Sequence, residues 1–378
     1  MDFAPTETQR MIADAVSALL ADRHDFETRR RRIRAGATHS ESLWAELADL
    51  GVLGAEIDEA HGGAGGALAD LLAVMEPCGS ALVNEPLVAS LVLSAGLIQK
   101  AGSESQKAAF LPGLASGACK AAVAHGERRA RDHLDWVEST AVRTEGGWRL
   151  DGAKQVVQGA DVADLLIVSA RASGLPDDAA GVSLFLMPAD QAGLSRRAYP
   201  VYDGSGAADL TLDGVVLPDE ALLGEEGRGL PLIHWAWDRA AAAVCVEAVG
   251  AMQALRDLTL DYIKTREQFG QPIGRFQVLQ HRMADLHMSV ELSRSMALLA
   301  VSAAGEEDVD KRARGLSAAK VAIAAACRDV GQSAIQLHGG LALTEEYAAG
   351  HYFKRLTLIE RQFGDRAHHL SRYARLMT

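Results

Sequence analysis

The residues best suited to chemistry gather between Arg266 and Gln277, where a long helical pattern ends in a loop that holds Gly270, Pro272 and Gly274. Arg266 would stand at the end of that helix with a planar, permanently charged guanidinium, which suits a pyrophosphate. Gln277 opens the next helical pattern, whose free backbone N–H groups also favour an anion. An arginine at a helix end has a simpler role as well, which is to offset the helix dipole. The residues alone leave both interpretations open.

Helical patterns cover both ends of the chain and would hold these residues in place. A capping box at Thr6 to Gln9 opens the first helix. After Gly229 the helical patterns become longer, and the last one is interrupted around Gly364. The other expected helices are 42–50, 67–75, 86–101 and 106–114 in the first third, then 230–265, 277–304, 308–337 and 348–377.

The middle of the chain, from Cys119 to about Gly229, changes to short runs rich in Val, Ile, Leu and Thr. Turn residues separate these runs, and both Glu145-Gly146-Gly147 and Asp213-Gly214 favour hairpin turns. The expected strands are 120–124, 138–143, 147–151, 165–170, 182–188 and 209–212. The order helix, strand, helix predicts an α+β, mostly α fold with three domains, 1–118, 119–229 and 230–378.

Composition excludes several classes of function. The chain has 378 residues and a formal net charge of -12, which argues against a nucleic-acid partner because phosphates attract a basic face. Its four cysteines are scattered, without the spacing of a zinc site, so we expect no metal and a reducing, cytoplasmic setting. We expect no signal peptide and no membrane-spanning segment, because no long apolar run is present.

Several motifs, taken together, resemble the acyl-CoA dehydrogenase family over essentially the whole chain. The resemblance implies the fold of that family: an N-terminal helical domain, a middle β-barrel-like domain and a C-terminal four-helix bundle. The motifs are Arg266-x-x-Phe269-Gly270-x-Pro272-Ile273-x-x-x-Gln277, Gln336-Leu337-His338-Gly339-Gly340 followed by 344–347, and Val216-Leu217-Pro218 with 223–229.

The resemblance also implies FAD bound between two subunits. In the family, residues at the positions of Arg266, Phe269 and Gln277 hold the adenine-pyrophosphate half of a neighbour's FAD. The flavin ring would lie near Val123 and the segment 156–158, and the shared site would make the chain a dimer or tetramer. The implied FAD-binding set is Arg266, Gln268, Phe269, Ile273, Gln277, Gln336, Leu337, Gly339, Gly340, Val123, Val156 and Gln158.

The chemistry implied by the resemblance is α,β-dehydrogenation of an acyl-CoA thioester, as in fatty acid or lipid degradation, with electrons passing to an electron-transfer flavoprotein. A carboxylate base takes the α-proton while the β-hydrogen leaves as hydride to the flavin. The usual base of the family falls on Phe363 in this chain, and the base pair of a second branch falls on Ala240-Ala241. None of these side chains can accept a proton.

Three carboxylates are candidates to replace the missing base. Glu247 lies in a nearly all-apolar stretch, and a buried carboxylate becomes a stronger base when it lacks a partner. Its alternative role is structural, paired with a backbone amide or with an arginine on a neighbouring helix. Asp365 lies two residues past the missing base, and its alternative role is the N-cap of the last helix. Asp238 is the weakest candidate, because acids are common in first turns.

The motifs Phe363-Gly364-Asp365, 245–250 and 350–355 look most like the small-subunit branch of pimeloyl-CoA dehydrogenase, in which a partner chain would carry the base. Two hypotheses follow: an active homo-oligomer that uses Glu247 or Asp365, or an FAD-binding partner subunit in a heteromer with little activity alone. A flavin oxidase or monooxygenase is a weaker third. The small residues at 240–243 suggest a roomy cavity, and we expect His368 and His369 to be exposed or to face CoA.

Overall fold

The computed structural model describes residues 5–131 and 133–377, and these fall into two compact units. The first unit comprises the described parts of Met1–Arg31 and Ala241–Thr378 together with Ala69–Val83. The second comprises Arg32–Leu68 and Asn84–Ala240, with its described residues. Each unit is therefore built from segments that are distant in sequence.

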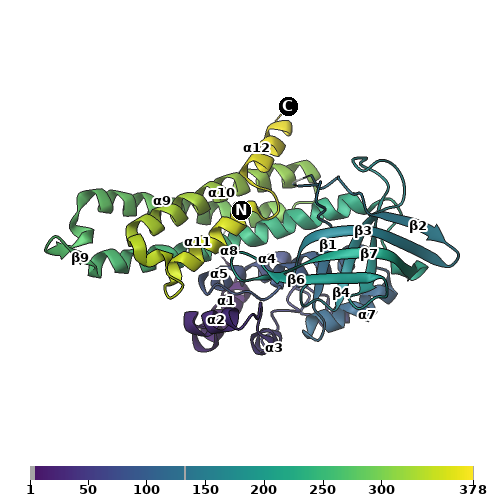
Figure 1. Ribbon diagram of the computed structural model, residues 1–378, viewed down its shortest axis with the longest axis horizontal. Helices are drawn as coiled ribbons and strands as arrows, with labels where there is room; N and C mark the ends of the chain where they lie inside the picture. Colours follow the sequence, from purple (N-terminus) through teal and green to yellow (C-terminus); the bar gives the residue numbers. More distant parts are fainter. Residues whose placement is uncertain (1–4, 132, 378) are drawn as a thin grey trace. The chain divides into compact units, whose positions relative to one another are not determined.

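The first unit is helical (Figure 1). Helix α10 packs against α9, α11 and α12, and α1 packs against α5. The side chain of Asp308 caps α10 by accepting hydrogen bonds from the N–H groups of Asp310 and Lys311 at 3.0 Å. The helices are α1 (Glu7–Arg23), α4 (Leu68–Leu72), α5 (Met75–Ser80), α8 (Gly229–Thr265, with its first residues in the second unit), α9 (Gln277–Ala304), α10 (Val309–His338), α11 (Ala348–Arg361) and α12 (Arg366–Arg375).

The long C-terminal helices are confirmed to within a residue or two of the expected bounds, including the break at Gly364. The capping box of α1 is confirmed as well, because Thr6 and Gln9 exchange hydrogen bonds of 3.0 and 3.2 Å. The single helix expected at 86–101 is a π-helix, η2 (Val88–Ala95), followed by α6 (Gly96–Ala101). The prediction missed α2 (Phe26–Arg34), because its run of arginines carries little apolar periodicity.

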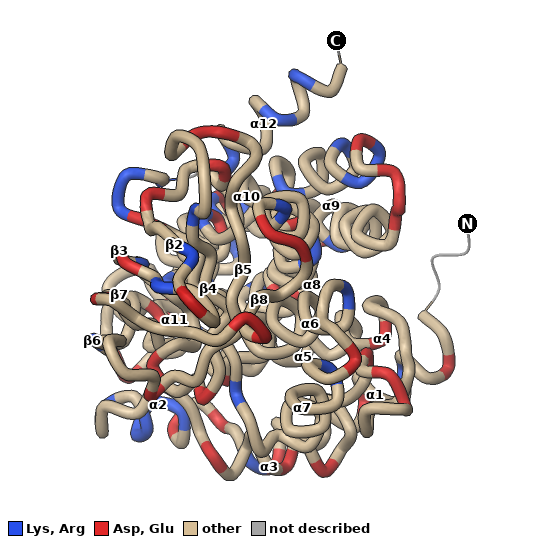
Figure 2. Tube along the Cα trace, turned by 90° about the vertical axis from the view of Figure 1, so that its right-hand side faces the viewer, with Lys and Arg blue, Asp and Glu red and all other residues tan. Residues whose placement is uncertain are grey.

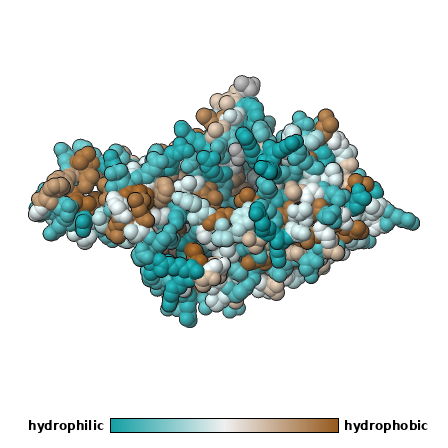
Figure 3. All heavy atoms as spheres, in the orientation of Figure 1, coloured by the Kyte–Doolittle hydropathy of each residue, from teal (hydrophilic) through white to brown (hydrophobic). Residues whose placement is uncertain are grey.

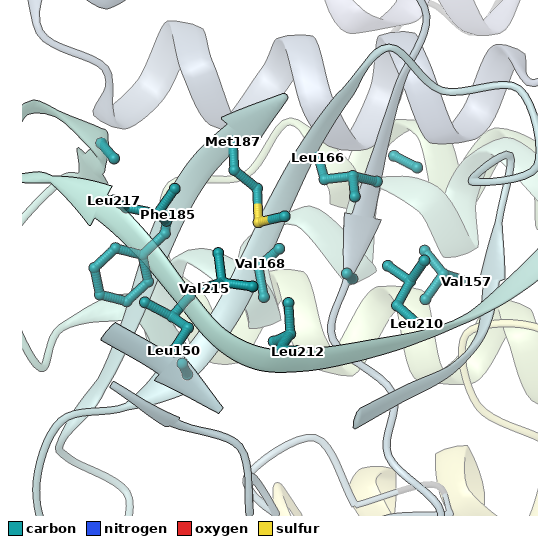
Figure 4. Packing of buried hydrophobic residues seen from close by; sticks show 14 of the residues in the cluster. Leu150, Val157, Leu166, Val168, Phe185, Met187, Leu210, Leu212, Val215 and Leu217 are labelled. Carbon is teal, nitrogen blue, oxygen red and sulfur yellow. The ribbon is translucent and has the colours of Figure 1, made fainter. Parts of the chain in front are cut away.

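The second unit holds an eight-stranded mixed sheet in the order β6-β7-β3-β2-β4-β5-β8, with β1 paired in parallel to β4. Helices α3 (Glu41–Asp49) and α7 (Glu104–Ala115) belong to the same unit. Figure 4 shows Leu150, Val168 and Met187 among the side chains that fill the sheet core. The strands are β1 (Ala121–Ala124), β2 (Thr140–Thr144), β3 (Gly147–Gln158), β4 (Leu165–Arg171), β5 (Val182–Pro188), β6 (Leu194–Pro200), β7 (Gly206–Pro218) and β8 (Leu222–Leu223).

The hairpin expected at Gly146 is confirmed, because β2 and β3 pair in antiparallel fashion directly around it. The turn expected at Asp213-Gly214 is wrong, since β7 runs straight through these residues. The positive φ of Gly214 (61°) there accompanies a shift in the register between β3 and β7, so the glycine serves a strand irregularity. The prediction missed β6, because its residues are largely exposed and carry little apolar alternation.

The surface carries interspersed acidic and basic residues, as Figure 2 shows along the trace. None of the helices in the described parts of the chain has the length and apolar character needed to cross a membrane. All four cysteines are free thiols, and burial raises the pKa of Cys245 and of Cys327 to about 12. The thiols of Cys245 and Cys327 are therefore unreactive and serve as packing groups, which is what a buried free cysteine normally does.

Helices α5 and α8 approach each other closely because glycine stands at both contact points. A Cβ added at Gly250 would lie 1.9 Å from the carbonyl oxygen of Glu76, and one added at Gly79 would lie 2.0 Å from that of Glu247. Neither glycine has a positive φ, so the requirement is for space and not for an unusual backbone conformation. The two backbones are packed so tightly that no side chain fits between them.

Replacing Gly250 with alanine should therefore force α5 and α8 apart and lower the free energy of unfolding by about 3 kcal/mol. Urea denaturation, followed by circular dichroism, measures this change. The matched control is G305A at the end of α9, where the nearest atom is 3.6 Å away and the change should stay within about 0.5 kcal/mol. Equal stability of G250A and the unmodified chain would contradict the close packing.

Candidate functional site

The turn between α8 and α9 presents the residues of the first motif, 266–277, largely to solvent. It consists of the two-stranded hairpin β9 (Glu267–Gln268) and β10 (Gln271–Pro272) and the short helix η4 (Ile273–Arg275). Arg266 fixes its base, because its N–H donates to the carbonyl of Tyr262 and its own carbonyl accepts from the N–H of Ile273, both at 2.8 Å. The side chains of Arg266, Gln268 and Gln277 are exposed, and Phe269 is 90% exposed. Figure 3 shows apolar side chains gathered at this tip.

Phe269 adopts a positive φ of 55°, an unusual conformation for an aromatic residue that Gly270 then continues at 79°. Its ring contacts Phe276 edge-on, with the ring centroids 6.1 Å apart. The hairpin thus leaves the ring of Phe269 and the side chain of Arg266 exposed to solvent. Nothing within the described chain covers the ring of Phe269 beyond this contact, so its exposure suits a ligand or a partner surface.

The second motif lies beside the first in the same unit. The ring of His338 at the end of α10 stacks on Tyr262 near the end of α8, with ring centroids 4.6 Å apart. Burial lowers the pKa of His338, whose Nδ1 bonds to the carbonyl of Ala334 at 2.9 Å. Gly339 ends the helix at a φ of 61°. The structure therefore brings the ends of α8 and α10, with both motifs, together.

Not every residue of the implied FAD set faces outward. Gln336, Gly339 and Gly340 are exposed, whereas Leu337 is buried in the helix packing. A contact between Leu337 and a ligand at this surface would have to come from its backbone. Ile273 is half-buried at the start of η4.

The residues expected beneath the flavin lie in the second unit. Val123 lies on β1 and is 6% exposed, and Gln158 is half-buried at the end of β3. Val156 is 56% exposed and has a positive φ of 51°, which is a real outlier for a β-branched residue. Its neighbour Val157 points into the sheet core. The bulge that contains Val156 therefore turns one side chain away from the sheet while the rest of β3 stays packed.

A buried polar network in the second unit escaped the sequence analysis. The ammonium of Lys154 lies 2.6 Å from a carboxylate oxygen of Glu127 and donates to the hydroxyl of Ser169 at 3.0 Å. His125 donates from Nε2 to the carbonyl of Leu134 at 2.8 Å, so its Nδ1 accepts from Ser169 at 2.9 Å. Burial, aided by the Lys154 ammonium, lowers the pKa of His125 to about 3. This network secures the loop after β1.

Glu247 is committed to a buried ion pair. Both oxygens of its carboxylate accept from Arg355 on α11, at 2.5 Å from Nε and 2.6 Å from Nη2. The side chains of Glu247 and Arg355 are 4% and 11% exposed. The alternative role weighed for Glu247, an arginine partner on a neighbouring helix, is thus what the structure contains. Both oxygens of the carboxylate are thus engaged by the guanidinium, which leaves neither of them directed at a substrate.

Asp365 is the N-cap of α12, because its side chain accepts a hydrogen bond of 2.8 Å from the N–H of His368. The preceding turn contains Phe363 at a φ of 57° and Gly364 at 99°. Lys320 holds this turn from α10, and its ammonium donates to the carbonyl of Gly364 at 3.1 Å and to the carbonyl of Ile359 at 2.9 Å. Burial lowers the pKa of Lys320.

The structure also bears on four smaller points of the sequence analysis. The expectation for His369 was wrong, since it is buried and its Nε2 donates to the carbonyl of Phe363 at 2.9 Å. The roomy cavity at 240–243 is also wrong, because those alanines are at most 1% exposed and no water-sized space adjoins them. Among the residues that the structure describes, no cluster of His, Cys, Asp or Glu could hold a metal ion. Asp238 is buried as well.

The helical unit, the mixed-sheet unit and the exposed α8–α9 turn are the elements expected of the acyl-CoA dehydrogenase fold. The family models for the acyl-CoA dehydrogenase N-terminal, middle and C-terminal domains match residues 6–118, 122–215 and 227–377. Acyl-CoA dehydrogenase FadE12 of Mycobacterium tuberculosis is 30% identical over 351 residues, which cover 91% of this chain and 89% of that protein. The chain belongs to the acyl-CoA dehydrogenase family.

Solved structures agree with this assignment. The Tcur3481-Tcur3483 steroid ACAD, solved as a variant, is 32% identical with a TM-score of 0.87 and covers 98% of each chain. The ChsE4-ChsE5 complex from Mycobacterium tuberculosis is 25% identical with a TM-score of 0.89, covering 100% of this chain and 99% of that chain. The FAD complex of PigA is 25% identical with a TM-score of 0.90, with the same coverage. The expected fold class is thereby confirmed.

Truncation of Glu247 should expose how much the buried pair contributes. The variant E247A removes the carboxylate that neutralises Arg355 and should lower the free energy of unfolding by about 3–5 kcal/mol. The double variant E247L/R355M should recover most of that loss, because neither charge is then buried. The control E345A breaks the exposed pair with Lys354 on the same helix and should cost less than about 1 kcal/mol in urea denaturation. A loss for E247A as small as that of E345A would contradict the structural role.

The two buried histidines should make the fold sensitive to acid. Burial, with the nearby Lys320 ammonium, lowers the pKa of His369 to about 3, and His125 behaves alike, whereas unfolded histidine titrates near 6.5. Below about pH 6.5 the unfolded chain binds protons that the native chain does not, so each histidine removes about 1.4 kcal/mol of stability per pH unit down to about pH 3.

Urea denaturation between pH 7 and pH 5 measures this acid dependence. Averaged over this range, the variant H369Q should lower the slope by about 1 kcal/mol per pH unit, while H281Q, at an exposed position on α9, should leave it unchanged. An unchanged slope in H369Q would show that His369 takes up a proton in the native state as readily as in the unfolded chain.

Proposed function

We propose that this chain is an FAD-binding subunit of an acyl-CoA dehydrogenase, and that the base for proton abstraction comes from a second, related chain. The observation that carries the proposal is that the two stronger candidate bases of this chain, Glu247 and Asp365, have structural duties. Glu247 is bound by Arg355 through both oxygens, and Asp365 caps α12. The residues that replace the bases of the family, Phe363 and the alanines at 240–241, cannot take a proton.

FAD fits the residues that this chain presents. Arg266 and Gln277 would bind the pyrophosphate of a neighbouring subunit's FAD through the guanidinium and the N-terminus of α9, and the exposed ring of Phe269 would cover its adenine half. Gln336, Gly339 and Gly340 would join them from the neighbouring turn. FAD supplies the acceptor for the β-hydrogen of the substrate. Val156 and Gln158 would line the flavin ring and keep water from that face.

The substrate is an acyl-CoA thioester, and its α-proton is only weakly acidic, so the reaction requires a base aimed at it. With Glu247 and Asp365 occupied, this chain contributes the cofactor clamp and the surface that shields the flavin. The partner would contribute the carboxylate, as in the small-subunit branch of pimeloyl-CoA dehydrogenase that the sequence resembles. Electrons would leave to an electron-transfer flavoprotein. We also propose that the chain divides into three domains, with boundaries at 118/119 and 229/230.

The similar structures support a mixed assembly, since one is a ChsE4-ChsE5 complex and another bears the two names Tcur3481-Tcur3483. The exposed tip with Phe269 and Val278 also suits burial against another chain of the family.

The second candidate is a homo-oligomer that is active alone with Glu247 as the base. One observation favours it: Glu247 lies on α8, the helix that carries the base in the second branch of the family, two turns after Ala240. Catalysis would then require Arg355 to release the carboxylate during turnover.

Anaerobic titration with a panel of acyl-CoAs separates the two candidates. The purified chain should be yellow and keep its flavin band when acyl-CoA is added. The band should bleach once a co-purifying acyl-CoA dehydrogenase-like chain is supplied. The control E307Q, at an exposed position of this chain, should behave like the unmodified protein in both steps.

Bleaching of the isolated chain that is lost in E247Q, while E307Q retains it, would favour the second candidate. A colourless chain that cannot be reconstituted with FAD, alone or with its partner, would overturn both.

A further inference from the structure

The bulge in β3 places one residue of β7 opposite two residues of β3. Lys154 pairs with Leu210 and Val157 pairs with Ala208, so Gln155 and Val156 share the single residue Asp209. In bulges of this kind the residue with positive φ is ordinarily glycine, because a side chain is strained there. Here that residue is Val156, at a φ of 51°, and its β-branched side chain makes the conformation costly. Some contact must hold it.

The contact comes from the side chain of Asp209. Its Oδ1 accepts the backbone N–H of Val156 at 3.1 Å and the hydroxyl of Tyr199 at 2.7 Å. Its Oδ2 accepts from the guanidinium of Arg197 at 2.7 Å. Although partial burial acts to raise it, these hydrogen bonds hold the pKa of Asp209 below its ordinary value, so the carboxylate stays charged. Two donors from β6 thus aim one carboxylate at the strained peptide of β3.

The strained conformation of Val156 exposes its side chain. Val156 is 56% exposed and Gln155 is half-buried, whereas Lys154 and Val157, which flank this pair, are buried, so the bulge lifts one apolar side chain out of the sheet. A relaxed strand would pair every residue and alternate the side chains between the two faces. The positive φ of Val156 therefore explains why its side chain points away from the sheet while those of Lys154 and Val157 are buried.

We infer that Asp209 is a positioning residue, which holds Val156 in its strained conformation so that this side chain packs against the flavin ring. The inference rests on the proposed function, because Val156 faces the flavin only if the chain binds FAD there. Arg197 and Tyr199 assist by fixing the rotamer of the carboxylate. Asp209 itself touches no reacting atom.

A double-mutant cycle on the full-length chain, with its partner where the chain is purified as a complex, tests this role. Fluorescence titration measures the affinity for FAD, the visible spectrum reports the environment of the ring, and thermal unfolding of the apoprotein reports the coupling without the cofactor. The variants are D209A, D209N, V156G and V156G/D209A. The control is D219A, which breaks an exposed pair with Arg143 in the same unit.

D209A should weaken FAD binding about tenfold and shift the flavin spectrum, because Val156 relaxes to an unstrained conformation. D209N should lose less, since its amide oxygen still accepts the N–H of Val156. In the V156G background, where glycine adopts the conformation freely, D209A should add no further loss of FAD affinity and little loss of thermal stability. D219A should match the unmodified chain.

The inference is overturned if D209A weakens FAD binding by the same factor in both backgrounds, since Asp209 would then act without Val156. It is equally overturned if D209A leaves FAD affinity within about twofold of the unmodified chain. A chain that binds no FAD at all would sink the proposed function. The thermal unfolding cycle of the apoprotein would then decide the positioning role, because additive effects of D209A and V156G exclude it and a loss confined to the Val156 background supports it.

Discussion

The ion pair between Glu247 and Arg355 is the constraint on which much of the helical unit depends. At Glu247 the backbones of α8 and α5 are in direct contact. Gly79 on α5 faces the carbonyl oxygen of Glu247 and leaves no room for a side chain. The same residue reaches across to α11 through its carboxylate. One residue therefore fixes α8 to a helix on either side. A buried charge in that position cannot lose its partner without a large cost in free energy, so the pair is retained as a unit.

That constraint also bears on chemistry. A general base must change protonation state during turnover, and it must reach the proton that it abstracts. A carboxylate with both oxygens held by a guanidinium, 4% exposed and central to helix packing, has little freedom to reach a substrate. A catalytic role would require the same carboxylate oxygens that accept hydrogen bonds from Arg355, and in this chain both oxygens are bound to Arg355. The proposal of a base from another chain follows from this competition more than from the missing family motifs.

Backbone strain follows the positions expected at the cofactor. Val156, Phe269 and Phe363 are non-glycine residues with positive φ, and each lies in a segment that the sequence associates with FAD or with the missing base. Each is flanked by a different contact: Asp209 binds the N–H of Val156, the backbone of Arg266 bonds to Ile273 across the hairpin that carries Phe269, and His369 binds the carbonyl of Phe363. Leu82 and Arg131 share the conformation outside those segments, so strain alone does not mark a site.

The sequence predicts what local pattern controls and misses what long-range contact decides. Helix α9 begins and ends at the expected residues, Gln277 and Ala304, because its apolar period and flanking turn residues are local signals. Strand β6 is missed because it lacks apolar alternation and forms through its pairing with β7, which the local sequence does not encode.

The same contrast explains the sites. Arg266 and Phe269 were found through a motif, whereas the Lys154–Glu127 pair and the Asp209–Val156 contact join residues far apart in the sequence. The contact between Asp209 and Val156 depends on the register of β3 against β7, and a shift of one residue would turn Val156 inward and Val157 outward. The register is fixed by the packed core around Val157 and Leu210, so the core of the sheet determines which side chain the bulge presents to a ligand.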